Sequence, residues 1–197
     1  MTTAVRPRSA TLRFSHAVLA VAVIHQLLVS EWMAKPWKLA DATAVQVTLF
    51  ELHEWVGLTL AVLLGGLLFA LARRYRSGVF GHFLPWLHRA GRKALAGELG
   101  PIVKAAKRLR PPTAAQTQVL AAAVQGIGLL TLLFFAVTGI AMSLMEDKLD
   151  LMHRIGSIHE LGALPLKLYL LGHAGMALIH EWRGEGLVRQ MLVPRQA

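Results

Sequence analysis

The sequence predicts an all-α integral membrane protein, a bundle of four helices that forms one domain over residues 1–197. Of its 197 residues, 55% are apolar and only 16% are charged, whereas soluble domains are about 25% charged. The apolar residues also gather in four segments, each near the length of about 20 residues that spans a bilayer. Lipid is therefore the expected environment of most of the chain.

Hydropathy places the four expected spans at about 12–32, 48–72, 118–144 and 158–182. The first three are each built around an uncharged run, whereas the fourth contains Glu160, Pro165 and Lys167. Ionisable side chains are costly in lipid and mark functional positions when they occur there. We therefore expect the fourth span, which also carries histidines, to be buried in a bundle.

Basic residues indicate the orientation of the spans. Sixteen of the 21 Lys and Arg residues fall in the N-terminal segment, in the connection 73–117 and in the C-terminal tail. The positive-inside rule then puts both termini and this basic inner connection in the cytoplasm. The connection also predicts a helix on the inner membrane surface, because apolar side chains stand among its basic residues. These are Phe80, Phe83, Trp86 and Leu87.

Charge and cysteine content exclude several classes of function. The net charge of +10 is accounted for by this topology and by anionic lipid headgroups, so the lipid bilayer is the expected partner and nucleic acid is not. Because the chain has no cysteine, it cannot form disulfides, thiolate metal sites, iron-sulfur clusters or a c-type haem. Any metal or haem would be held by histidine, methionine or oxygen ligands.

Four histidines occupy matched depths in the expected bundle. His159 and His173 are 14 residues apart, so on one helix they share a face, about 40° out of register and about 21 Å apart along the axis. Because successive spans alternate in direction, His16 shares the inner level with His173, and His53 shares the outer level with His159. Imidazoles on both sides of a porphyrin give a six-coordinate haem iron, which suits electron transfer. The set thus predicts two haems at two levels.

Two interpretations from other classes stay open at this point. A haem-free transporter or metal-handling membrane protein would use the histidines to relay protons or to bind zinc, with ligands converging on one point. A structural membrane subunit would use them for hydrogen bonds between helices or in the headgroup region.

The histidines stand in sequence pieces that resemble the bacterial cytochrome b561 family and the membrane cytochrome subunit of formate dehydrogenase. These pieces are Arg13-Phe-Ser-His16, His53-Glu-Trp-Val-Gly57, His159-Glu-Leu and Leu171-Gly-His173-Ala-Gly-Met-Ala-Leu-Ile-His180. In that superfamily the first-helix histidine pairs with the inner histidine of the fourth helix, and the second-helix histidine pairs with the outer one. Many compact members also have a histidine early in the third helix, where this chain has Gln118 and Gln125. No third-helix role is therefore transferred.

The resemblance implies a di-haem cytochrome with two haem b groups, whose irons are held by His16 with His173 and by His53 with His159. It further implies a multi-pass protein of the bacterial inner membrane, with electron transport between the quinone pool and a periplasmic cytochrome or dehydrogenase subunit. A free-standing quinone oxidoreductase and the membrane anchor subunit of a periplasmic dehydrogenase are both compatible with it. No catalytic residue is assigned, and whether the chain is itself an enzyme or forms a homodimer is left open.

Two further residues are expected near the inner haem. Haem propionates are anions that need donors, and Arg13 is the expected donor. His180 follows His173 by seven residues on the same face, about 10 Å nearer the cytoplasm. It is expected either to replace His173 as a ligand or to lie at the propionates or at a quinone site.

Overall fold

The computed structural model describes residues 10–74, 78–107, 112–145 and 148–192. Within these ranges every regular element is a helix, which confirms the all-α class. Four apolar helical segments are long enough to cross a membrane, and they lie where four spans are predicted. They are α1 (Ala10–Ser30), α2 (Ala44–Arg74), α5 (Gln118–Ser143) and a rod made of α6 (Leu149–Leu161) and α7 (Ala163–Trp182).

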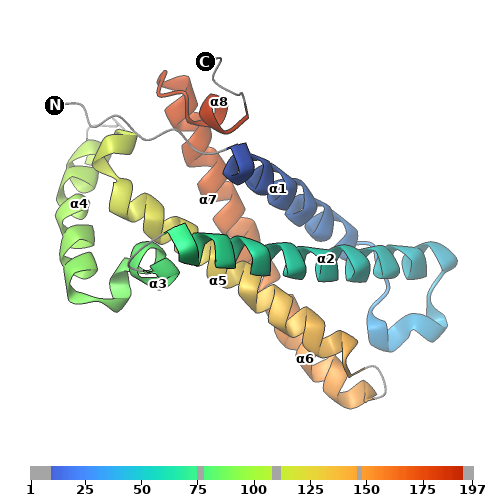
Figure 1. The fold of residues 1–197 in the computed structure, drawn as a ribbon. Coiled ribbons are helices and arrows are strands. Elements are labelled where there is room, and N and C mark those ends of the chain that lie inside the picture. Colours follow the sequence, from blue (N-terminus) through green and yellow to red (C-terminus); the bar gives the residue numbers. More distant parts are fainter. Residues whose placement is uncertain (1–9, 75–77, 108–111, 146–147, 193–197) are drawn as a thin grey trace.

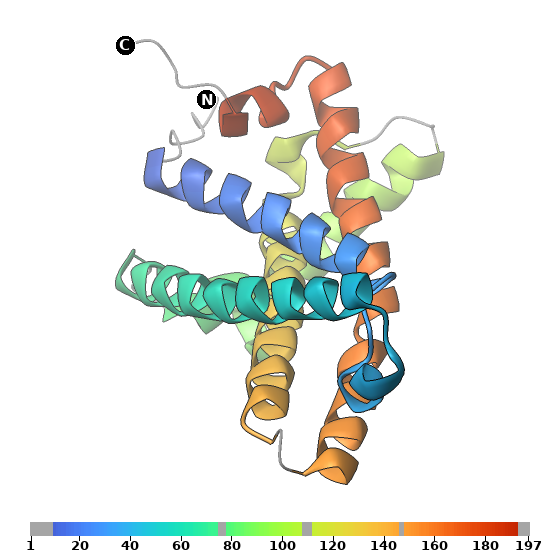
Figure 2. The ribbon, with the colours of Figure 1, turned by 90° about the vertical axis from the view of Figure 1, so that its right-hand side faces the viewer.

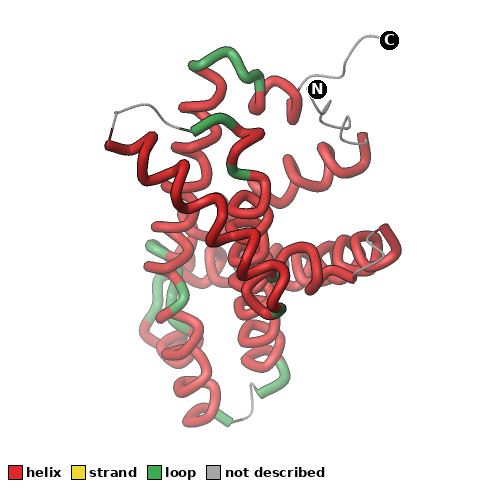
Figure 3. Tube along the Cα trace, turned by 90° about the vertical axis from the view of Figure 1, so that its left-hand side faces the viewer, coloured by secondary structure: helices red, strands yellow, loops and turns green. Residues whose placement is uncertain are grey.

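The four segments pack as two crossing pairs. Helices α1 and α2 lie beside each other and cross α5 and the α6–α7 rod (Figure 1, Figure 2). The described chain is almost entirely helical, with short loops between the helices (Figure 3). The final helix α8 (Leu187–Leu192) returns to pack against both α7 and α1. The start of the first span and the segment after the last one therefore meet at one end of the bundle.

The outer surface of the bundle is apolar. Val62 on α2 and Leu171 on α7 are 76% and 73% exposed, and large apolar side chains are exposed along all four segments. In water, an apolar surface of this extent would be unfavourable. It fits a chain whose spans face lipid on one side and one another on the other.

The last span begins earlier than predicted. Helix α6 starts at Leu149 rather than near residue 158, and Asp150 in its first turn suits the positive end of the helix dipole. The rod is broken at Gly162, between α6 and α7. Pro165 explains the break, because its ring nitrogen cannot donate to the carbonyl of Leu161 as an unbroken helix requires. The two histidines of this span therefore stand on separate helices.

The long connection is more deeply packed than predicted. It forms α3 (Gly78–Phe83), a 3-10 turn η2 (Pro85–Leu87), α4 (Arg89–Lys107) and a second 3-10 turn η3 (Ala114–Gln116). The prediction of a single surface helix across the aromatic residues is wrong, because Leu84 precedes Pro85 and its backbone dihedral angles are not helical. Phe83 and Leu84 are each only 5% exposed. The Phe83 carbonyl lies against Gly126 of α5, where an added Cβ would meet its oxygen at 1.9 Å.

Helix α4 is tied to α5 by one carboxylate. The Glu98 side chain accepts hydrogen bonds from the backbone N–H groups of Val119 (2.9 Å) and Leu120 (2.8 Å). These donors lie in the first turn of α5, where N–H groups have no partner within the helix. Glu98 thus caps α5 from a different helix.

The loop between α1 and α2 packs on α6. It contains the 3-10 turn η1 (Pro36–Asp41). Trp37 lies 4.6 Å from the His153 ring, centroid to centroid, and the Lys35 ammonium lies 2.6 Å from the Glu160 carboxylate. A second ion pair joins Lys167 of α7 to Glu31. This end of the bundle is held by exposed charge pairs, each of which contributes about 1 kcal/mol or less.

Candidate functional site

One predicted histidine pair joins the first and the last span. The ring centroids of His16 on α1 and His173 on α7 are 6.2 Å apart, with the ring planes inclined by 45°. Tyr169, one turn before His173 on α7, stacks on the His173 ring at 5.4 Å with an angle of 13°. The Tyr169 hydroxyl occupies the space beside Gly128 of α5, where an added Cβ would lie 2.3 Å from the hydroxyl oxygen. The stacked tyrosine thus limits the orientation of His173.

The other predicted pair joins the second span to α6. The ring centroids of His53 on α2 and His159 on α6 are 6.4 Å apart, with an interplanar angle of 76°. The His159 Nδ1 atom lies 2.7 Å from the Thr138 hydroxyl of α5, and the Phe135 ring lies edge-on to His159 at 4.8 Å. The Gln26 side-chain amide of α1 donates to the His53 backbone carbonyl at 2.8 Å. The pair is therefore fixed by contacts from α1 and α5.

The histidines come together as separate pairs rather than as one cluster. Within the described ranges no group of three or more His, Asp or Glu side chains is arranged to hold a metal ion. The two pairs draw on different helices, α1 with α7 and α2 with α6. This is the arrangement predicted from the histidine depths, and it differs from the converging set expected of a zinc site.

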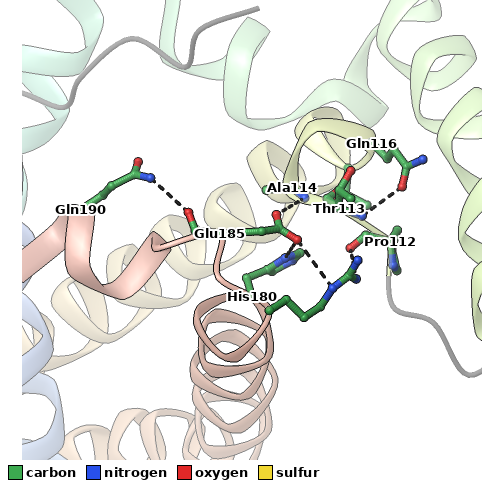
Figure 4. Close-up of polar contacts among 9 residues, drawn as sticks. Pro112, Thr113, Ala114, Gln116, His180, Glu185 and Gln190 are labelled. Carbon is green, nitrogen blue, oxygen red and sulfur yellow. Dashed lines mark hydrogen bonds and ion pairs between the residues drawn. The ribbon is translucent and has the colours of Figure 1, made fainter. Parts of the chain in front are cut away.

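His180 lies in a polar cluster at the end of α7 (Figure 4). The residue is only 5% exposed, and its Nδ1 atom is 3.2 Å from a Glu185 carboxylate oxygen. The same carboxylate accepts a 2.8 Å hydrogen bond from the Ala114 backbone N–H of η3. Arg183 lies 3.9 Å from Glu185 and donates to the Pro112 carbonyl at 3.4 Å. In this structure His16 faces His173, and His180 faces Glu185.

The surroundings of Glu185 favour its charged form. Burial by itself raises the pKa of the Glu185 carboxyl, because it penalises the ionised state. The hydrogen bond from Ala114, the contact with His180 and the charge of Arg183 act in the opposite direction. Together they bring the pKa of Glu185 below its ordinary value. The cluster is therefore a fixed negative charge beside a buried imidazole.

Arg13 lies on α1, three residues before His16, and is half-buried. Residues three apart on a helix are neighbours on its surface. The structure thus puts a guanidinium group on the same side of α1 as one member of the first histidine pair. That proximity is what a propionate donor requires, and this role for Arg13 stays a prediction.

Sequence analysis missed the supporting residues, which are Thr138, Tyr169, Gln26 and Glu185. Thr138 and Gln26 each act on a residue of another helix, so sequence neighbours carry no sign of these two contacts. Thr138 had the most visible signal, since it is a hydroxyl within a strongly apolar span. Tyr169 also precedes His173 by one helical turn, a spacing that brings two side chains together.

Fold and site together define a multi-pass helical membrane protein in which histidines of different spans face each other in pairs. Facing side chains in the interior of a helix bundle are the usual ligands of a bound metal or haem. The profile of a family described as prokaryotic cytochrome b561 matches residues 8–193, and the chain belongs to this family. No curated protein and no solved structure matches the chain. Family membership makes it a bacterial multi-pass membrane cytochrome that binds haem b and takes part in electron transfer.

Proposed function

We propose that the chain is a di-haem cytochrome b that carries electrons across the inner membrane, between the quinone pool and a periplasmic redox partner. The observation that carries this proposal is the pair of histidine pairs, His16 with His173 and His53 with His159, at nearly equal separations. Each pair would hold one haem b through its iron. The family supplies the cofactor type, and the pairs support the number two.

The separations fit haem iron held from both sides. An imidazole nitrogen binds a first-row metal at about 2 Å, and adding the distance from that nitrogen to its ring centre on each side gives about 6 Å between the two centroids. The pairs measure 6.2 Å and 6.4 Å. Two hydrogen-bonded imidazoles have no reason to match this value twice. The donor set also suits the group, because neutral imidazoles are common axial ligands of b haems.

Each side chain then has a defined task. His16 and His173 would hold the inner haem, and His53 and His159 would hold the outer one. A bis-histidine haem supplies a one-electron redox centre with no open coordination position. With both histidines bound, such a centre would suit electron transfer rather than binding of oxygen.

The distribution of charge supports the orientation of the chain in the membrane. The excess of basic residues near both ends and in the connection 73–117 supports a cytoplasmic location for these parts. Arg13 would then neutralise a propionate of the inner haem. The buried His180 beside Glu185 lies at the same end, where a quinone headgroup could exchange protons with the cytoplasm.

The test is haem content and visible spectrum of the protein purified in mild detergent. We expect a low-spin b-type spectrum with two haems per chain in the parent protein. His16→Ala and His173→Ala should each leave one haem, and His53→Ala and His159→Ala should each leave the other. The matched control is His88→Ala, an exposed histidine between η2 and α4, which should keep both.

Several results would overturn the proposal. Zinc without haem in the parent protein would favour the metal-handling interpretation, and two haems in His53→Ala and His159→Ala would remove these ligands from the scheme. A dehydrogenase that co-purifies in fixed proportion would instead identify the chain as a membrane anchor subunit. Reduction of the haems by a quinol in the isolated protein would support the free-standing oxidoreductase.

A further inference from the structure

Helix α5 carries no histidine, but three of its residues lie against His159 of α6. Along one turn of α5, the Phe135 ring lies edge-on to His159 at 4.8 Å, and the Thr138 hydroxyl lies 2.7 Å from its Nδ1 atom. Gly139 borders the same ring, since a Cβ added there would lie 3.7 Å from His159 Cε1. One face of α5 therefore contacts the ring of His159 at three positions.

The hydrogen bonds of Thr138 decide which nitrogen of His159 carries the proton. A threonine hydroxyl has one proton to donate and two lone pairs with which to accept. The Thr138 hydroxyl lies 2.7 Å from the Phe134 carbonyl, one turn earlier on α5, and 3.3 Å from that of Phe135. A helix carbonyl can only accept, so the hydroxyl proton goes to Phe134. Thr138 then accepts from His159, which puts the ring proton on Nδ1.

A proton on Nδ1 leaves Nε2 with its lone pair, which is the state required of a metal ligand. Metal-bound histidines almost always donate their other N–H to a nearby acceptor, which fixes the ring and raises its basicity. His53 differs, because its buried Nδ1 atom has no hydrogen-bond partner among the described residues. Within this pair, only His159 has a neighbour that determines which of its two ring nitrogens carries the proton.

We propose that Thr138 is a positioning residue that holds His159 in its Nδ1–H form and thereby tunes the outer haem. The inference rests on the proposed function, in which His159 binds the iron of that haem. A donor bond from Nδ1 makes the imidazole a stronger ligand for ferric iron. Loss of the acceptor should therefore raise the midpoint potential of the outer haem and weaken its retention. The inner haem should be unaffected.

Two threonines of α5 allow a matched comparison. Thr131, two turns before Thr138, makes the same bond to its own helix, with its hydroxyl donating to the Ile127 carbonyl at 2.9 Å. It borders an apolar groove between α5 and the rod that Phe134 and Pro165 also line, and its hydroxyl makes no hydrogen bond to a histidine of the described ranges. Thr138→Val and Thr131→Val remove one hydroxyl each, whereas Thr138→Ser keeps the acceptor.

The experiment is redox potentiometry and low-spin ferric electron paramagnetic resonance of the purified holoprotein, with haem release to an acceptor protein. In Thr138→Val we expect one of the two redox steps to move to higher potential, one ferric signal to change, and haem to leave that site about 10–100-fold faster. Thr138→Ser should behave as the parent protein, and so should Thr131→Val. The affected step should be the one that His159→Ala eliminates.

The outcomes separate this inference from the proposed function. A parent protein without two haems overturns the proposed function itself. A parent protein with two haems and an unchanged Thr138→Val overturns only the role of Thr138, as does a Thr138→Ser variant as impaired as Thr138→Val. If Thr138→Val does not accumulate, Thr138→Ala against Thr138→Ser gives the same comparison of hydroxyl absent with hydroxyl present. Equal potentials in these two would again contradict the proposal.

Discussion

Replacing Glu98 with alanine should loosen the start of α5 without touching any histidine. The Glu98 carboxylate accepts from the N–H groups of Val119 and Leu120 at 2.9 Å and 2.8 Å. Intrahelical bonding of α5 begins only at Ala121, whose N–H donates to the Thr117 carbonyl. The two amides therefore have no acceptor within the helix, and the substitution leaves both without their partner.

The magnitude follows from these two bonds. Removing an N-cap oxygen costs about 0.5–2 kcal/mol, and a hydrogen bond to a charged group contributes about 1.5–3 kcal/mol. Because Glu98 is only half-buried, water can take over part of its hydrogen bonding. We therefore expect Glu98→Ala to lower the free energy of opening the first turn of α5 by about 2 kcal/mol. That corresponds to an opening equilibrium constant about 30-fold larger for the first turn of α5, and so to faster amide exchange there. Glu98→Gln keeps an acceptor oxygen and should lose about half of this free energy.

Hydrogen exchange of the protein in detergent measures this opening directly. The peptide that contains Val119 and Leu120 should exchange faster in Glu98→Ala, while peptides from the middle of α5 should not. Glu51→Ala removes an exposed carboxylate from α2 and serves as the control for a simple change of net charge. Equal exchange at Val119 and Leu120 in the Glu98→Ala and Glu51→Ala variants would refute the cap.

Two other perturbations test the remaining contacts. Gly128→Ala puts a Cβ 2.3 Å from the Tyr169 hydroxyl oxygen, so it should displace Tyr169 from the His173 ring and change the spectrum of one haem only. The control is Gly66→Ala, which has open space around it and should leave the haem spectrum unchanged. Equal spectra in the two variants would contradict this account. Because the pKa of Glu185 is below its ordinary value of 4.5, its contribution to stability is present above that pH and is lost as pH falls through the folded-state pKa. The thermal midpoint should therefore drop more on acidification in the parent than in Glu185→Gln, and parallel pH profiles would speak against the cluster.

Sequence pattern predicts the four spans well, because membrane thickness fixes how long an apolar run must be. Alternating direction also pairs His16 with His173 and His53 with His159, whose rings lie 6.2 Å and 6.4 Å apart in the structure, whereas their role as ligands stays a prediction. The helix of the last span begins before the apolar segment that hydropathy identifies, because Asp150 and Arg154 lower the hydropathy of a part that is nevertheless helical. Hydropathy measures the cost of burial, and α6 exposes much of its surface.

Contacts between helices could not be predicted in the same way. The bond between Thr138 and His159 depends on the rotation of α5 against α6 to within a fraction of a turn, and no periodicity in either segment specifies it. The burial of Phe83 against α5 depends on Gly126, a residue more than forty positions later in the chain. Glycine in a membrane helix has many ordinary packing uses, so its presence alone did not identify this contact.

Helix α5 contacts both histidine pairs and so bears on the distance between them. The rod that carries His159 and His173 is divided at Gly162, although the backbone of Gly162 itself keeps helical dihedral angles. Helix α5 is continuous and contains no proline, and it contacts one site through Thr138 and the other through Gly128. These positions are ten residues apart, or about 15 Å along a helix. In a di-haem protein, the span without ligands would thus help to hold the two haems at a constant separation, through Thr138 at one pair and through Tyr169 at the other.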